Sequence, residues 1–115
     1  MKYALLIYEK PGALDGVGEQ ERSDMYGEYM ALAQDSRCLD GAQLQPVTTA
    51  TTVRVQNGNT LTTDGPFADT KEVFGGYYVF EAGNLDEALE LAGRIPAARY
   101  GGSVEVRPVV ERGRH

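Results

Sequence analysis

The segment Thr63-Asp64-Gly65-Pro66-Phe67 contains the side chain in this sequence that is best suited to acid–base chemistry. A carboxylate such as Asp64, when it lies near apolar walls, can have its pKa raised toward neutrality and then act as a general acid or base. The same residues also form a good turn, because Asp bonds nearby backbone amides, Gly adopts unusual dihedral angles and Pro fixes φ. Two roles therefore stay open for Asp64: a catalytic or ligand-anchoring role, and a purely structural one.

Five further side chains could complete a ligand site around Asp64: two cations, two phenols and one phenyl ring. They are Arg54, Lys71, Tyr8, Tyr78 and Phe67. A cation could orient an anionic group of the ligand, and a tyrosine hydroxyl could donate a hydrogen bond to it. Phe67 has a second interpretation, in which its ring only plugs the loop onto the core.

Other common kinds of site are not expected. Cys38 is the only cysteine, so there is no internal disulfide and no multi-cysteine metal site. Its thiol has two interpretations, a reactive group or a half-buried small residue, and we expect the second. His115, the only histidine, is the last residue, where a catalytic role is not expected. Gly75-Gly76 precedes a predicted strand, which favours a bulge or a close approach of two chains over phosphate binding. With no phosphate-loop, nucleophile-elbow or metal-ligand pattern elsewhere, we expect no cofactor and no metal.

Length and charge limit the class of protein. A chain of 115 residues makes one domain, which we place at 1–110, followed by a short mobile tail at 111–115. The net charge of −6 and the pI near 4.7 argue against a nucleic-acid partner, because phosphate backbones bind clustered Lys and Arg. The apolar run at residues 1–8 is too short for a membrane span or a signal peptide, so we expect no membrane association and a cytoplasmic location.

Alternation and helical spacing predict the elements that must position these side chains. In the first half of the chain they are a strand at 2–8, a helix from 19 to about 33 that Gly41 follows as the exit, and strands at 51–56 and 60–62. The tight turn Asn57-Gly58 joins those two strands. A strand at 74–80, a helix from 85 to 95 that Asn84 caps and Pro96 stops, and a strand at 104–107 complete the chain. The second helix is expected to bury Leu85, Ala88, Leu89, Ala92 and Ile95.

The apolar pattern of each strand predicts its place in the sheet. The segments 2–8 and 74–80 are apolar on both faces, as central strands are, whereas 51–56 and 104–107 alternate, as edge strands do. The predicted fold is therefore α+β, a ferredoxin-like β-α-β-β-α-β chain with an antiparallel four-stranded sheet and an extra short hairpin arm.

Two helices can cover only one face of such a sheet. The other face would expose Tyr77 and Val79, or Tyr78 and Phe80, as a larger apolar patch than monomers usually carry. A second sheet packed against it is the simplest cover. We therefore expect a homodimer through the sheet faces, with any cavity lying between them, and Asp64 at the mouth of that cavity.

Residues 62–72 resemble the signature of the DGPF family, which is related to the YCII-like proteins. The signature reads D-G-P-F-A-E-T-K-E, and this chain departs from it only by Asp69. Further similar segments are spread over most of the chain: 1–8, 44–46, 50–54, 75–78 and 96–108. The resemblance implies a dimeric ferredoxin-like α/β-barrel.

The resemblance also bears on function. Members of the family are mostly uncharacterised, and many are neighbours or fusion partners of sigma factors, which implies a link to sigma-factor regulation. Some YCII-like relatives carry a His–Asp pair in the barrel cavity, and this chain lacks that pair. The main expectation is therefore a dimeric ligand-binding or regulatory module. The alternative is a cofactor-independent enzyme of the dimeric barrel type that acts on a small organic substrate with Asp64 as acid or base.

Overall fold

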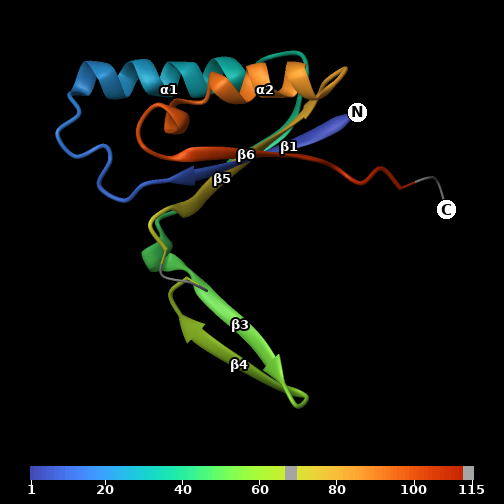
Figure 1. Cartoon of the computed structure of the whole chain (residues 1–115). Helices are drawn as coiled ribbons and strands as arrows, with labels where there is room; N and C mark the ends of the chain where they lie inside the picture. Colours follow the sequence, from blue (N-terminus) through green and yellow to red (C-terminus); the bar gives the residue numbers. More distant parts are fainter. Residues whose placement is uncertain (67–69, 113–115) are drawn as a thin grey trace.

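The computed structural model describes residues 1–66 and 70–112 of the chain (Figure 1). Its strands and helices are β1 (Lys2–Glu9), α1 (Glu19–Ala33), β2 (Cys38–Gln43), β3 (Thr51–Gln56), β4 (Asn59–Asp64), β5 (Val73–Glu81), α2 (Leu85–Gly93) and β6 (Ser103–Pro108). Short 3₁₀ helices follow at Val47–Thr49 and Pro96–Ala98. Phe67 and most of the predicted tail lie outside the described residues. Within the described part, no helix is both long enough and apolar enough to cross a membrane.

A four-stranded antiparallel sheet forms the body, with the strand order β2-β5-β1-β6. Both helices lie on one face of this sheet (Figure 1). The prediction of a mixed α+β fold with β1 and β5 in the centre is confirmed.

The predicted second strand of the sheet is wrong. The edge next to β5 is β2, and residues 51–56 belong instead to a separate two-stranded hairpin. The sequence of β2 does not alternate, because only Cys38 in it packs against the core and its other residues are exposed. Gly41 is therefore not a helix exit but a residue of β2, where a Cβ would lie 2.8 Å from the ring of Tyr78.

The hairpin of β3 and β4 is an arm that leaves the body on the side opposite the helices (Figure 1). Asn57 and Gly58 both have positive φ, 51° and 79°, which is the two-residue turn that Asn-Gly predicts. The arm widens the molecule: the radius of gyration is 16.3 Å, against about 13 Å for a compact chain of this length. We refer to residues 51–64 as the hairpin arm.

The core lies between the sheet and the helices. Strand β1 contributes Tyr3, Leu5 and Ile7, and β5 contributes Tyr78 and Phe80. Helix α2 covers them with three residues that are buried: Ala88, Leu91 and Ala92. The predicted stripe of α2 is partly wrong, because Leu85 and Leu89 lie on its exposed flank and Leu91 takes their place. The helix ends at Gly93, before Pro96 starts its own 3₁₀ turn.

A cluster of charges ties the start of β2 to the start of α2. The Asn84 side chain accepts a hydrogen bond from the Glu87 N–H at 2.9 Å, which confirms the predicted cap. Glu87 accepts from the backbone of Gly83 at 3.1 Å and from Arg37 at 3.0 Å. Arg37 also donates to both carboxylate oxygens of Asp35. These bonds hold the pKa of each carboxyl below its ordinary value.

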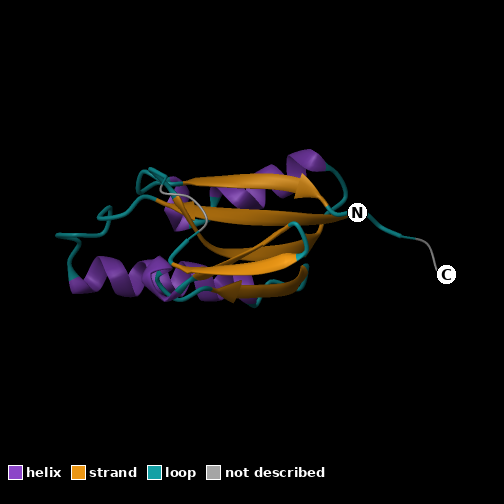
Figure 2. Cartoon of the chain, turned by 90° about the horizontal axis from the view of Figure 1, so that it is seen from below, coloured by secondary structure: helices purple, strands orange, loops and turns teal. Residues whose placement is uncertain are grey.

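The opposite face of the sheet, which we call the open face, carries no helix. Cross-strand pairing places on it a partly exposed apolar stripe along β1 and β5: Ala4, Leu6, Tyr8, Phe74, Tyr77 and Val79. The rings of Tyr8 and Phe74 are 5.5 Å apart. Of the two pairs that the sequence left open, Tyr77 and Val79 are therefore the pair that the helices leave uncovered. Figure 2 views the molecule from this side, with the hairpin arm in front of the sheet.

Candidate functional site

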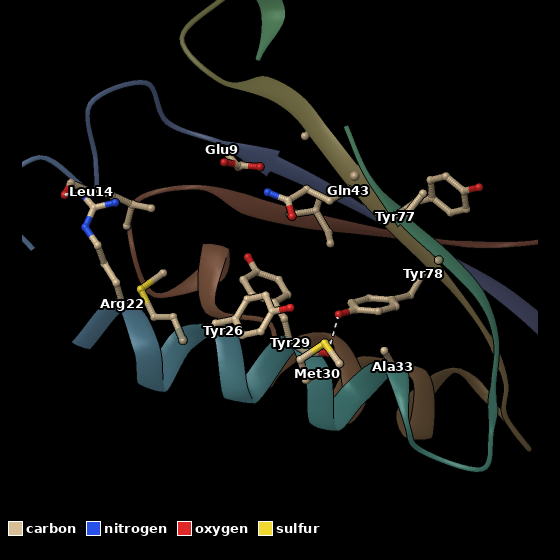
Figure 3. Close-up of a pocket in the computed structure, with 16 residues that line it drawn as sticks. Glu9, Leu14, Arg22, Tyr26, Tyr29, Met30, Ala33, Gln43, Tyr77 and Tyr78 are labelled. Carbon is tan, nitrogen blue, oxygen red and sulfur yellow. Dashed lines mark hydrogen bonds between the residues drawn. The ribbon is translucent and has the colours of Figure 1, made fainter. Parts of the chain in front are cut away.

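A pocket of about 500 Å³ opens between α1 and the β2–β5 edge of the sheet (Figure 3). Helix α1 supplies one wall with Met25, Tyr26, Tyr29 and Met30. The strands supply the other wall, where β5 runs past β2 and the end of β1. The pocket is thus on the helix side of the sheet, within one protomer, and not on the open face.

The strand wall is hollow because it is built from glycine. A Cβ on Gly76 would lie 2.6 Å from the Ala42 carbonyl oxygen, so only glycine lets β2 and β5 pack this closely here. A Cβ on Gly75 would lie 1.8 Å from a carboxylate oxygen of Glu9, whose side chain lies over the bare backbone. The β1–β5 register shifts next to these residues, between Ile7 and Tyr8. The predicted bulge and close chain approach at Gly75-Gly76 are both confirmed.

Two buried phenols line the pocket, Tyr29 from α1 and Tyr78 from β5, and both are neutral. The Tyr78 hydroxyl donates a hydrogen bond to the Tyr29 carbonyl oxygen at 2.8 Å (Figure 3). Burial raises the pKa of Tyr78 to about 12, with smaller contributions from Tyr29 and Cys38. Burial likewise raises the pKa of Tyr29. Because the Tyr78 proton is committed to the backbone, this phenol shapes the pocket and is poorly suited to donate a proton to a ligand.

Polar side chains line both walls of the pocket. Arg22 donates to the carbonyl oxygens of Leu14 at 2.5 Å and Val17 at 3.2 Å, which fastens the loop before α1 onto the helix. Those two bonds use two of its five N–H groups, so others can meet a ligand. Glu9 and Gln43 line the pocket from the strand side (Figure 3). In the part of the chain that the structure describes, no group of three His, Cys, Asp or Glu side chains could hold a metal ion.

Of the six residues predicted for the site, the structure places one in this pocket, Tyr78. Tyr8 lies on the open face against Phe74. Lys71 is exposed in the segment before β5.

Asp64 and Arg54 lie on the hairpin arm, where Asp64 pairs with Thr51 and Arg54 with Leu61. Strand alternation therefore directs these two side chains to opposite sides of the arm. Phe67 is outside the described residues. A single protomer does not gather the described members of the set, and the ligand-binding role of each stays a prediction.

The pocket residues that the sequence reasoning missed are Glu9, Arg22, Tyr26, Tyr29, Met30 and Gln43. The sequence did contain two features that indicate a pocket at this place. Helix α1 carries bulky side chains over an arc wider than a core-facing stripe needs, and a glycine pair interrupts the central strand that it covers. Together, a wide aromatic helix face and a strand without side chains leave a space between them.

Three comparisons relate the chain to known proteins. A family model described as the YCII-related domain matches residues 1–112. An uncharacterized protein of Rhizobium meliloti (strain 1021) is 34% identical over 114 residues, which cover 95% of this chain and 92% of the relative. The fold is similar to that of 5-chloro-2-hydroxyhydroquinone dehydrochlorinase from Burkholderia phenoliruptrix AC1100, solved in complex with 2,5-dihydroxybenzoquinone. That match has a TM-score of 0.51 and 21% identity over 100% of this chain and 95% of the other, so it concerns the fold alone.

Proposed function

Because this chain belongs to the family of YCII-related domains, we propose that it is a homodimeric module that binds a small organic molecule in the pocket between α1 and β5 of each protomer. The observation that carries the proposal is the pocket itself. Its volume of about 500 Å³ lies in the range of roughly 300–1,000 Å³ typical of small-molecule sites.

The lining indicates the kind of ligand. Tyrosine rings and the flexible thioethers of Met25 and Met30 suit a flat apolar body. Arg22 and Gln43, from opposite walls, suit oxygen atoms on the edge of that body. A small ring compound with hydroxyl, keto or carboxylate groups meets both conditions. The dihydroxybenzoquinone bound to the dehydrochlorinase of similar fold is a molecule of this kind.

The open face supports the dimer. Its stripe includes Leu6, Phe74, Tyr77 and Val79, all partly exposed in the single protomer. Contiguous apolar patches of this kind mark interaction surfaces, and two-fold pairs are the commonest assemblies of soluble proteins. The proposed dimer has the two open faces packed against each other, as in a dimeric α/β-barrel.

Ligand binding takes precedence over catalysis here because the predicted acid or base, Asp64, does not line the pocket. Asp64 lies on the hairpin arm, so the alternative, a cofactor-independent enzyme, requires a second protomer to bring Asp64 to a ligand. We further propose that ligand binding regulates a sigma factor. This part of the proposal rests on the family resemblance alone.

The pocket can be tested by filling it. Ala33 is exposed at one end of the pocket and Ala31 lies outside it on the same helix, so Ala33→Trp and Ala31→Trp are a matched pair. We expect hydroxylated benzoquinones and phenols to bind the full chain in calorimetry and to raise its melting temperature. Ala33→Trp should weaken that binding at least tenfold, and Ala31→Trp should not change it. Equal binding by both variants would move the site elsewhere.

Asp64→Asn separates the two functions. Asparagine tolerates the same backbone, so the variant should keep its stability. For a binding module, affinity at the pocket should also be unchanged. If the wild-type chain transforms a bound compound and the Asp64→Asn variant does not, the enzyme alternative replaces the proposal.

A further inference from the structure

The hairpin arm has no core of its own. It consists of two strands, and the side chains of Val53, Val55 and Leu61 are 58%, 66% and 45% exposed. An isolated two-stranded hairpin is at best marginally stable in water, and it needs a further strand or another packed surface. In the described chain the arm packs chiefly on itself, and the hydrogen bond from Gly65 N to the Ala50 oxygen, 2.7 Å, closes its base. Within the described residues the arm therefore has little cover beyond its own two strands.

The position of the arm decides what that cover is. The arm lies on the side of the sheet opposite the helices (Figure 1). Seen from that side, it lies in front of the sheet (Figure 2). A molecule that packs on the open face must therefore meet the arm as well. The apolar stripe of the open face and the exposed valines of the arm thus bound the same space.

The sizes of these surfaces favour a shared partner. Four strands about 4.8 Å apart, with roughly seven residues of ~3.3 Å each, give the open face a flat area of roughly 450 Å². A stable interface buries about 800 Å² on each partner. One side of the arm adds roughly 200 Å² more, from two strands of six residues. The arm therefore enlarges the surface that a partner on the open face could bury.

The two sides of the arm differ in polarity. Cross-strand pairing puts Val53 opposite Thr62 and Val55 opposite Thr60, so this side is uncharged over the outer arm and rich in methyl groups. The other side pairs Arg54 with Leu61 and ends in two amides, Gln56 and Asn59. Interface cores are depleted of charge, so the outer part of the valine side, away from Asp64 at the base of the arm, is the part suited to burial.

We infer that the hairpin arm is a clasp: in the homodimer, the valine side of each arm packs against the second copy of the chain that covers the open face. This inference rests on the dimer proposed above and is independent of the ligand pocket. The occupant is a second copy because the arm continues the open face, and a two-fold pair lets each protomer both give and receive an arm.

Removing the arm is the first test. Ala50 and Gly65 are already hydrogen-bonded, so an Asn-Gly link can replace residues 51–64 without moving the body. We expect this variant to keep the circular dichroism and the cooperative melting of a folded body. Its dimer dissociation constant, measured by sedimentation, should rise at least tenfold. A folded variant that dimerises as tightly as the full chain would overturn the clasp.

Two point variants test the side of the arm, and they remain informative if the deletion variant fails to fold. Val53→Asp and Leu61→Asp each put a carboxylate in place of an exposed apolar side chain, near the middle of the hairpin but on opposite sides. Val53→Asp should weaken the dimer at least tenfold, and Leu61→Asp should change it by less than about threefold. Equal effects, or the reverse order, would refute docking through the valine side.

The failure of the clasp and of the proposed function are distinguishable. A full chain that stays at the 12.5 kDa monomer mass at micromolar concentration removes the dimer and the clasp together, and leaves pocket binding standing. If the chain is a dimer but the backbone amides of residues 51–64 exchange rapidly with solvent hydrogen, the clasp is refuted and the dimer is not. Slow exchange of those amides that becomes fast on dilution is the expected result.

Discussion

Two adjacent glycines, Gly75 and Gly76, have different roles in the strand wall of the pocket. A methyl group on Gly76 would press on the backbone oxygen of Ala42, which cannot move without displacing β2. A methyl group on Gly75 would press only on the end of the Glu9 side chain, which can rotate away. One glycine is therefore needed for the sheet, and the other sets the position of a carboxylate in the pocket.

We expect Gly76→Ala to lower the free energy of unfolding by about 1–3 kcal/mol, as overpacking of a close contact does. Gly75→Ala is the control and should lose much less, while it changes ligand affinity through Glu9. Urea unfolding of the two variants measures the difference. If Gly75→Ala were the more costly change, the assignment of the close contact would be wrong.

Tyr78 gives the fold a dependence on alkaline pH. Its pKa is raised to about 12 in the folded chain from an ordinary value of 10.0, so the folded state favours the neutral phenol. Stability from this group is complete below pH 10 and is lost as the pH rises toward 12, because the unfolded chain ionises first. Tyr78→Phe should cost about 1 kcal/mol at pH 7 through the lost hydrogen bond to Tyr29. Its stability should also fall less steeply than that of the wild type between pH 10 and 12 in urea titrations.

At the scale of elements, Arg37 joins the turn before β2 to the first turn of α2. Its partners Asp35 and Glu87 have pKa values held below their ordinary values of 3.8 and 4.5, first by hydrogen bonds from Arg37 and from the Gly83 backbone respectively. A lowered carboxyl pKa stabilises the fold above the ordinary value, and that contribution is lost as the pH falls through and below it.

Arg37→Met should therefore lower the melting temperature at pH 7, and the difference from the wild type should shrink as the pH drops below about 4. Arg94→Met is the control, because Arg94 pairs with Glu90 along the exposed side of α2, where such pairs contribute little. Differential scanning calorimetry between pH 3 and 7 measures both. A difference for Arg37→Met that does not depend on pH would exclude the carboxylate partners as its cause.

The sequence predicted the elements whose signals are local. Helix α1 has Met25, Tyr29 and Leu32 on one face, the Asn57-Gly58 turn has its own dihedral preference, and β1 and β5 are apolar on both sides. It misassigned residues 51–56, because an alternating strand looks the same in an isolated hairpin as at the edge of a sheet. Strand β2 was missed for the opposite reason, since its pairing partner, and not its own side chains, makes it a strand.

The site was harder to predict than the fold. Asp64 was chosen for its chemistry; it lies at the base of the arm and does not line the pocket, so its role stays a prediction. The pocket arises from missing side chains at Gly75 and Gly76 and from the width of an aromatic helix face. A pocket forms where two surfaces meet in the fold, so no motif within either segment predicts it.

At the scale of the whole molecule, assembly should control stability. Leu6 lies on the open face in the centre of β1, and Leu89 is exposed on α2, on the far side of the sheet. Leu6→Lys should give a monomer at micromolar concentration, because a buried ammonium has no partner there. Leu89→Lys should remain a dimer. Light scattering separates the two, and a dimeric Leu6→Lys variant would argue against packing through the open face.

A dimer that contributes to folding also makes the melting temperature depend on protein concentration. We expect the wild type to melt at a higher temperature as its concentration rises. The variant without the arm should show this rise only at higher concentrations. A melting temperature that is constant over a hundredfold range would mean that each protomer is stable alone.

The position of β1 has a consequence for the making of the chain. This strand is translated before its two neighbours in the sheet, β5 and β6, which lie in the last two fifths of the sequence. A ribosome that has reached the hairpin arm has therefore produced no partner for it. Contacts between such distant segments form slowly, and chains that wait with apolar strands exposed are prone to associate wrongly. Synthesis must pass Ser103 before β1 can pair with strands on both sides. Until then its apolar side chains need protection from wrong contacts.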